Sequence, residues 1–131
     1  GTLPQGKTIT EIAHSCDWLP TLAELAKVQL IETSIDGKSL APLLQEKTNE
    51  GPHGILHWQV GNGDRAQWAV RDGDWKLIGN VRDTSNPKSA GSPASKLFLS
   101  NLKADPGELT NYAKEHPEIV ERLKAAHDSF R

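Results

Sequence analysis

Polar and aromatic side chains gather around one short segment near the middle of the chain. They are His57, Trp58, Gln59, Asn62, Arg65 and Gln67, with Asp64 among them. Imidazole, amide and guanidinium groups beside an indole ring are suited to binding a sugar or an anion, and binding residues often lie in loops held by a rigid scaffold. We therefore predict that these side chains contact a substrate. The alternative is an ordinary exposed strand end.

The single cysteine, Cys16, lies two residues after His14 and just before a predicted helix. A catalytic thiol needs a lowered pKa and a basic partner, and a helix start with a nearby histidine would supply both. A lone cysteine is more often a small buried apolar residue. We favour that second interpretation and assign no catalytic residue.

The remaining titratable residues form no metal or catalytic pattern. His53 and His57 are four residues apart, but Gly54 and the strand-like residues after it argue against a helix that would align them. A zinc site also needs three or four ligands, so we predict no metal site in this chain. Nearly all of a group of aspartates adjoin Gly or Pro, which is typical of turns: Asp36, Asp72, Asp74, Asp83 and Asp105.

Composition narrows the class of protein. The chain has 131 residues and a formal net charge of −2, which argues against nucleic acid as its main partner. Its apolar runs are far shorter than the roughly 20 residues that span a bilayer, and it opens with no basic and apolar leader. The sequence contains no methionine, from which we expect a fragment of a longer protein.

The first part of the chain predicts two helices. Residues 8–13 alternate Thr and Ile, as a short strand or extended arm does. Asp17 is the predicted N-cap of a helix that ends near Lys27, because leucines recur after it at helical spacing. A second short helix is predicted over residues 39–44, and a loop over residues 45–52.

The second part predicts strands over residues 55–60, 66–71, 74–78 and 96–99, with a loop over 80–95 and a turn into a short helix or loop around 109–111. Asp72-Gly73 predicts a type I′ hairpin that puts Trp68 and Val70 on one face with Trp75 and Leu77 on one face of the partner strand. A final helix begins with Pro117 at its first position. Its predicted apolar stripe is Ile119, Val120, Leu123, Ala126 and Phe130. The expected fold class is α+β, a small four-stranded antiparallel sheet with one face covered by helices.

Four segments, in order, resemble motifs of the sulfatase family. Residues 17–26 (DWLPTLAELA) resemble its D-x-x-P-T-L-x-x-L-A helix, and residues 36–44 (DGKSLAPLL) resemble the D-G-x-S-L-x-P-L-L segment that follows. Residues 69–78 (AVRDGDWKLI) are similar to the A-V-R-x-G-x-W-K-L-I hairpin. Residues 97–111 (LFLSNLKADPGELTN) are similar to the L-Y-D-L-x-x-D-P-x-E-x-x-N signature. The chain thus resembles the C-terminal part of a sulfatase of the arylsulfatase or N-acetylgalactosamine-6-sulfatase type.

The resemblance implies a division of the chain. Residues 1–48 would be the C-terminal end of a large α/β catalytic domain with the alkaline-phosphatase-like fold. Residues 49–131 would be the sulfatase C-terminal subdomain. The segment would then be structural, and its candidate binding residues would line the substrate rim.

The resemblance also implies chemistry that lies elsewhere in the parent protein. The parent would hydrolyse sulfate esters of a sulfated sugar or aryl compound, using calcium and a formylglycine made from Cys or Ser in C/S-x-P-x-R. Cys16 does not match that motif, because Trp18 stands where Pro is needed and Pro20 where Arg is needed. We therefore expect the chain alone to lack the nucleophile and the metal site and to be inactive.

The implied partners are the missing N-terminal catalytic domain and a sulfated glycan or aryl sulfate, and the parent is expected in the periplasm or secreted. Without that domain the chain would expose Leu19, Leu22, Leu25, Leu40 and Leu43, so we expect the isolated chain to self-associate or repack. Two other functions stay open. One is a stand-alone carbohydrate-binding module using Trp58, Trp68 and Arg65, and the other is a fragment of a phosphoester hydrolase of the same superfamily.

Overall fold

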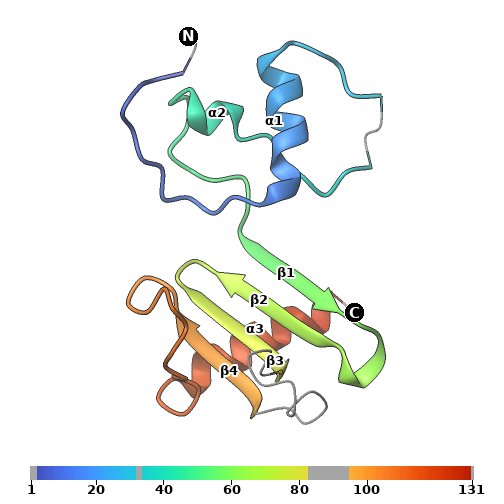
Figure 1. The fold of residues 1–131 in the computed structure, drawn as a ribbon, viewed down its shortest axis with the longest axis vertical. Coiled ribbons are helices and arrows are strands. Elements are labelled where there is room, and N and C mark those ends of the chain that lie inside the picture. The colour runs from blue at the N-terminus through green and yellow to red at the C-terminus, as the bar shows by residue number, and fades with distance from the viewer. Residues whose placement is uncertain (1–2, 32–33, 83–94, 131) are drawn as a thin grey trace. The chain divides into compact units, whose positions relative to one another are not determined.

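The computed structural model describes residues 3–31, 34–82 and 95–130. The chain forms two compact units, Gly1–Gly54 and Ile55–Arg131, each of which is described by itself (Figure 1). Most of the predicted loop over residues 80–95 lies outside the described residues. No helix in the described ranges has the length and apolar character needed to cross a membrane.

The first unit contains short helices joined by irregular chain. The 3₁₀ turn η1 (Ser15–Asp17) leads into α1 (Trp18–Leu25), and α2 (Ala41–Leu44) follows. Helix α1 ends where predicted. Lys27 takes a left-handed φ of 56°, while Lys27 N–H donates to Glu24 O and Val28 N–H donates to Ala23 O. This pair of bonds is the Schellman motif. Residues 8–13 form no strand.

Gly37 in the first unit lies where the backbone at Cys16 approaches it closely. A Cβ at Gly37 would lie 2.1 Å from the carbonyl oxygen of Cys16. Any side chain at this position would therefore push apart the segments that meet beside η1. Gly37, which belongs to a turn signal in the sequence, is therefore required here by packing.

The second unit is a four-stranded antiparallel sheet with strands in chain order. Its strands are β1 (Ile55–Val60), β2 (Gln67–Asp72), β3 (Trp75–Val81) and β4 (Ser95–Asn101). All four predicted strands are confirmed, and β3 runs on through Asn80 and Val81, which the sequence placed in a loop. A short 3₁₀ turn, η2 (Gly63–Arg65), connects β1 to β2.

The β2–β3 hairpin differs from its predicted turn type. Asp72 pairs with Trp75, so the two central residues are Gly73 and Asp74. Only Gly73 has a positive φ, 56°. A type I′ turn needs positive φ at both central residues, whereas positive φ at the first alone is the pattern of type II′. The predicted facing of the hairpin is confirmed: Val70 lies opposite Leu77 and Trp68 opposite Gly79.

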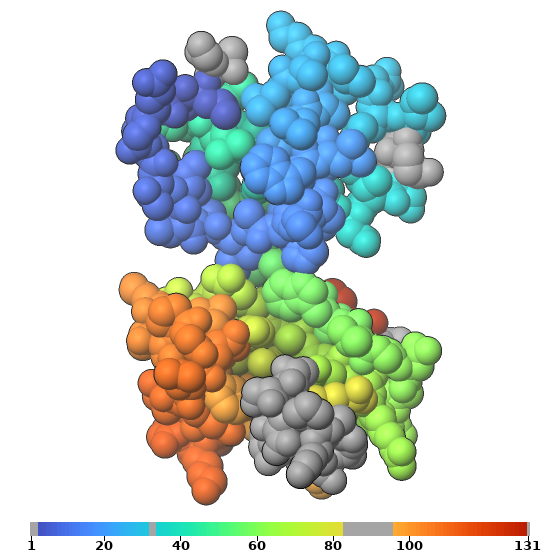
Figure 2. Space-filling view, in the orientation of Figure 1, coloured from blue at the N-terminus to red at the C-terminus, as the bar shows by residue number. Residues whose placement is uncertain are grey.

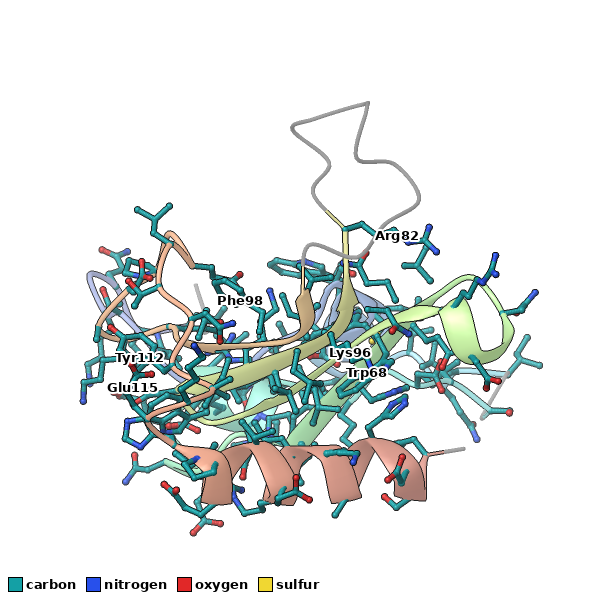
Figure 3. All side chains as sticks on the ribbon, turned by 90° about the horizontal axis from the view of Figure 1, so that it is seen from below. Trp68, Arg82, Lys96, Phe98, Tyr112 and Glu115 are labelled. Carbon is teal, nitrogen blue, oxygen red and sulfur yellow. The ribbon has the colours of Figure 1, made fainter. Side chains whose placement is uncertain are left out.

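Helix α3 (Pro117–Ser129) covers one face of this sheet, with Pro117 at its first position as predicted. Figure 3 shows the helix lying along the sheet, with Trp68 between the two. The core is formed by residues that are at most 7% exposed: Val70, Leu77, Leu99, Val120 and Leu123. Phe130, which we predicted in the apolar stripe, is 54% exposed. On the opposite face the described residues form no helix, and strand atoms of the second unit are visible at the surface in Figure 2.

Strand β4 lies at the edge of the sheet. Residues of the fourth motif hold the segment that follows β4 alongside it. The Asp105 carboxylate accepts the N–H groups of Leu109 and Thr110. Asn111 accepts Leu99 N–H through Oδ1 and donates to Leu97 O through Nδ2. An edge strand otherwise offers unpaired backbone groups to other chains. Asn111 therefore protects this edge, and no helix forms around residues 109–111.

Candidate functional site

The structure divides the six predicted binding residues between the two faces of the sheet and the β1–β2 connection. Neighbouring strand residues point to opposite faces. His57 pairs with Val70 and Gln59 with Trp68, so both lie on the face that α3 covers. Trp58 and Gln67 lie on the other face. Asn62 and Arg65 are exposed in the connection between β1 and β2.

His57 takes part in an aromatic stack under the end of α3. Its Nε2 lies 2.9 Å from His127 Nδ1, and its ring stacks on Phe130 at a centroid distance of 4.8 Å. Burial lowers the pKa of His57, because desolvation disfavours the imidazolium form. A hydrogen bond between two imidazoles needs one protonated and one unprotonated nitrogen. The pair is therefore held together best when the two rings do not both carry a charge.

His127 is 4% exposed and stacks on Trp68, with ring centroids 3.9 Å apart and planes 8° apart. On the strand side the indole lies over Gly79, where an added Cβ would lie 2.0 Å from Trp68 Cε2. The indole is thus packed between β3 and α3. The apolar stripe predicted for the last helix did not include His127. Its spacing of four residues from Leu123 was the available signal that it faces the core.

A half-open pocket of about 130 Å³ lies beside this stack. Its polar lining comes from Gln59, Asp64, Asn80 and His127, and Ala66, Trp68 and Gly63 complete it. Asn80 shapes the wall: its Nδ2 donates to the carbonyls of Asp64 and Ala66, at 3.0 and 2.8 Å. Gln59 and Asp64 are the residues of the predicted cluster that line this pocket. Asn80 and Trp68 were not predicted to lie in it, because the residues that meet here come from β1, η2, β2, β3 and α3.

The exposed part of the β1–β2 connection carries positive charge. Arg65 is exposed in η2, and Arg82 Nη2 donates to the Arg65 carbonyl at 3.0 Å. This bond fixes the Arg82 guanidinium beside the turn that carries Arg65. The turn that carries Arg65 therefore has a second guanidinium beside it, that of Arg82, which was not predicted from the sequence.

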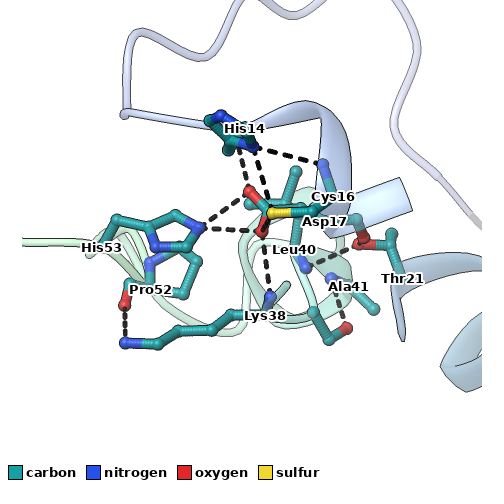
Figure 4. Close-up of polar contacts among 10 residues, drawn as sticks. His14, Cys16, Asp17, Thr21, Lys38, Leu40, Ala41, Pro52 and His53 are labelled. Carbon is teal, nitrogen blue, oxygen red and sulfur yellow. Dashed lines mark hydrogen bonds and ion pairs between the residues drawn. The ribbon is translucent and has the colours of Figure 1, made fainter. Parts of the chain in front are cut away.

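The first unit contains a buried polar cluster around Asp17 (Figure 4). The Asp17 side chain is fully buried and accepts the backbone N–H of His14 at 2.7 Å and of Lys38 at 2.9 Å. His53 Nε2 lies 2.8 Å from both carboxylate oxygens. Burial by itself raises the pKa of Asp17, but the hydrogen bonds from Lys38, His14 and His53 outweigh it and hold that pKa below its usual value.

This cluster corrects the role predicted for Asp17. Its side chain makes no capping bond to α1. It forms a capping box with His14 around η1 instead, and it joins three segments that are far apart in the sequence. Thr21 extends the cluster, because its Oγ1 donates to Asp17 O and accepts Leu40 N–H.

Cys16 is exposed, so its interpretation as a small buried apolar residue is wrong. Its Sγ lies 3.1 Å from His14 Nδ1, which is the pairing that a nucleophile would need. However, desolvation and the negative charge of Asp17 raise the pKa of the Cys16 thiol. The thiolate is thus disfavoured, contrary to the effect expected of a helix start.

Within residues 3–31, 34–82 and 95–130, no group of three or more His, Cys, Asp or Glu side chains could hold a metal ion. The Asp17 cluster offers one carboxylate and one imidazole that bond to each other. The residues described here do not fit a calcium site, and we derive no catalytic step through a metal or a formylglycine from this chain.

Sequence comparison finds curated relatives along most of the chain, although no protein-family model matches it. Arylsulfatase A from Bos taurus is 37% identical over 131 aligned positions, which cover 88% of this chain and 25% of the relative. Arylsulfatase A from Homo sapiens is 34% identical, covering 87% and 25%. Arylsulfatase K from Xenopus laevis is 31% identical, covering 90% and 22%. The chain thus spans about a quarter of the length of these relatives.

Solved structures show the same fold. A putative sulfatase from Bacteroides thetaiotaomicron superposes with a TM-score of 0.71 at 22% identity, covering 99% of this chain and 27% of that one. A structure from work on glycosaminoglycan metabolism by the same organism gives a TM-score of 0.60 at 26% identity, covering 87% and 24%.

The four-stranded sheet with its C-terminal helix, preceded by short helices, is therefore part of the sulfatase fold. Sequence homology to arylsulfatases A and K gives the same answer. The chain is a partial sulfatase region.

Proposed function

We propose that this chain is the C-terminal part of a sulfuric ester hydrolase. Residues 1–48 would complete the large catalytic domain, and residues 49–131 would form the C-terminal subdomain. The observation that carries the proposal is the 37% identity to bovine arylsulfatase A over 88% of the chain. The chain spans a quarter of that relative, which supports a parent whose nucleophile, calcium ligands and activity lie outside this chain.

The same relatives support a substrate class for the parent protein. Arylsulfatases are named for sulfate esters, and the structure that is 26% identical comes from glycosaminoglycan metabolism. We propose a sulfated sugar or an aryl sulfate as the substrate of the parent, with this chain supporting the catalytic domain and lending the β1–β2 connection to the substrate rim. A periplasmic or secreted location belongs to the same proposal.

The exposed apolar face of α1 supports an intramolecular partner. Trp18, Leu19 and Leu22 are 62%, 57% and 56% exposed, although they lie together on one helix. Such a patch is seldom left open to water in a folded protein. We propose that the remainder of the parent catalytic domain covers it.

The test is to express the complete reading frame that contains this chain and to measure sulfate release. The substrates are 4-nitrophenyl sulfate and N-acetylgalactosamine 6-sulfate, with 4-nitrophenyl phosphate as the matched phosphoester. Preferential release of sulfate supports the proposal. Preferential release of phosphate would assign the parent to the phosphoester hydrolases instead, and no release of either would contradict the proposal.

A further inference from the structure

The Asn62-Gly63 pair in the β1–β2 connection combines two groups that can react with each other. The side-chain amide carbon of an asparagine is an electrophile, and the backbone nitrogen of the next residue can close a five-membered ring onto it. A glycine at that next position has no Cβ to hinder the approach. Of the asparagines in the sequence, Asn62 alone is followed by glycine.

The structure leaves both groups of this pair open to reaction. Asn62 is exposed, and its side chain makes no capping bond to η2, although asparagine is a favoured N-cap residue. Within the described part of the chain, neither that side chain nor the Gly63 N–H forms a hydrogen bond. Both the nucleophile and the electrophile are therefore free to move.

The backbone around Asn62 can reach the geometry that ring closure needs. The ψ angle of Asn62 is extended, at 158°, and must turn to bring the Gly63 nitrogen toward the side-chain Cγ. Gly61 has a φ of 88° and Gly63 a φ of 65°. Because glycine adopts positive and negative φ at similar cost, a glycine on each side lets the connection accommodate this rotation.

The other described asparagines lack one of these conditions. Those whose side chains are hydrogen-bonded to the backbone are Asn80, Asn101 and Asn111. Asn49 is exposed like Asn62, but the next residue is Glu50, whose backbone N–H donates to Thr48 Oγ1 at 3.0 Å. Asn49 is therefore a matched comparison, in which the attacking nitrogen is both hindered by a side chain and engaged in a hydrogen bond.

We propose that Asn62 is a site of spontaneous deamidation in the folded protein. The Gly63 nitrogen bonds to Asn62 Cγ and its proton goes to Nδ2, which leaves as ammonia when the Cγ–Nδ2 bond breaks. Water then adds to one of the two carbonyl carbons of the succinimide ring. Opening at Cγ gives aspartate, and opening at the main-chain carbon gives isoaspartate. The only co-reactant is water, and the new carboxyl group ionises to add a negative charge.

The modification would change the β1–β2 connection, and it goes beyond the proposed function. Isoaspartate inserts an extra carbon into the backbone just before η2, whose Arg65 carbonyl accepts the Arg82 guanidinium. Either product also places a carboxylate on the exposed turn that carries Arg65. The charge of this turn would therefore depend on the age of the protein.

The test incubates the 131-residue chain at mildly alkaline pH in water labelled with heavy oxygen, followed by exchange into ordinary water and trypsin digestion. Cleavage after Lys47 and Arg65 releases residues 48–65, which carry both Asn49 and Asn62. Fragment ions in the mass spectrum then compare the two asparagines within one peptide, and the label excludes deamidation during digestion. We expect label at residue 62 to appear at least about tenfold faster than at residue 49, with isoaspartate among the products.

Two variants and an unfolded control complete the test. Asn62→Gln should abolish labelling at residue 62, because glutamine closes only a slower six-membered ring, whereas Asn49→Gln should leave labelling at residue 62 unchanged. The folded chain should react no more than about tenfold more slowly than the chain unfolded in guanidinium, because exposed loops open at little cost in free energy. Similar rates at residues 49 and 62, aspartate without isoaspartate, or stronger protection by folding would overturn the proposal. None of these outcomes depends on sulfate release by the parent.

Discussion

The Asp17 side chain joins separate segments of the first unit through hydrogen bonds. Three donors converge on its carboxylate from residues 14, 38 and 53, and it is fully buried. A buried carboxylate with all its partners is stable, whereas removing one side of such a cluster leaves the other groups unpaired in the interior. The first motif therefore begins with Asp for a structural reason.

Replacement of Asp17 by Ala should destabilise the first unit by about 3 kcal/mol or more, since it removes the hydrogen-bond partner of two backbone N–H groups and of the His53 imidazole. Amide hydrogen exchange at Lys38 and Leu40 checks this directly, because Lys38 N–H donates to Asp17 and Leu40 N–H to Thr21. Asp36→Ala, at an exposed aspartate, is the control and should leave exchange unchanged. Equal effects of the two substitutions would show that the cluster is unimportant.

His57 should make the second unit sensitive to mild acid. Burial lowers its pKa in the folded protein, so the unfolded chain binds more protons around the ordinary histidine pKa of about 6.5. The stability linked to His57 is thus fully present above that value and is lost as the pH falls toward the lowered folded pKa.

Urea unfolding of the chain, followed by tryptophan fluorescence between about pH 7.5 and pH 5, measures this dependence. The His57→Gln variant should show a flatter pH profile, because glutamine does not titrate. His14→Gln, at a histidine of the other unit, should keep the wild-type profile. A His57→Gln profile with the original slope would assign the acid sensitivity to other groups.

At the level of elements, the hairpin depends on contact between β3 and the Trp68 side chain. Gly79→Ala would place a Cβ 2.0 Å from Trp68 Cε2 and displace the indole from its stack on His127. Overpacking of this kind costs about 1–3 kcal/mol. The midpoint of urea unfolding should fall accordingly, and the Trp68 N–H resonance should move. Gly54→Ala, where an added Cβ meets nothing within 4 Å, should be close to neutral.

The elements themselves were largely predictable from local pattern. Alternating apolar residues and the Gly73 turn located the four strands, and Pro117 located the start of α3. The turn type was not predicted correctly, because Gly73 has an aspartate on each side and the sequence alone does not show which one is the second central residue of the turn. Asn111, which protects the β4 edge, looks like an ordinary loop residue until Leu97 and Leu99 are placed beside it.

The sites were much less predictable, because their residues come together only in the fold. Asp17 and His53 are 36 residues apart, and His57 and His127 are 70 residues apart. The sequence grouped His57, Trp58 and Gln59 as neighbours, yet the strand turns Trp58 to the other face. Local spacing thus grouped residues that the strand separates, and it did not identify the pocket.

At the scale of the whole molecule, helix α1 carries apolar side chains that the described residues of the first unit leave exposed. Trp18, Leu19 and Leu22 are each more than half exposed on α1. Burial of apolar surface contributes about 25 cal/mol per Å², so the isolated chain gains stability by covering this face with a second copy. We expect concentration-dependent association of the isolated chain in light scattering.

The double variant Leu19→Glu/Leu22→Glu should shift this association toward monomer, because charges at the contact cannot be buried without a partner. Lys124→Glu on the exposed side of α3 changes the net charge by the same two units, and it should leave association unchanged. In the complete parent protein the same double substitution should reduce soluble yield, since the proposed catalytic domain needs that face. A chain that stays monomeric at all concentrations, with a double variant that leaves the parent unaffected, would mean that α1 packs against nothing.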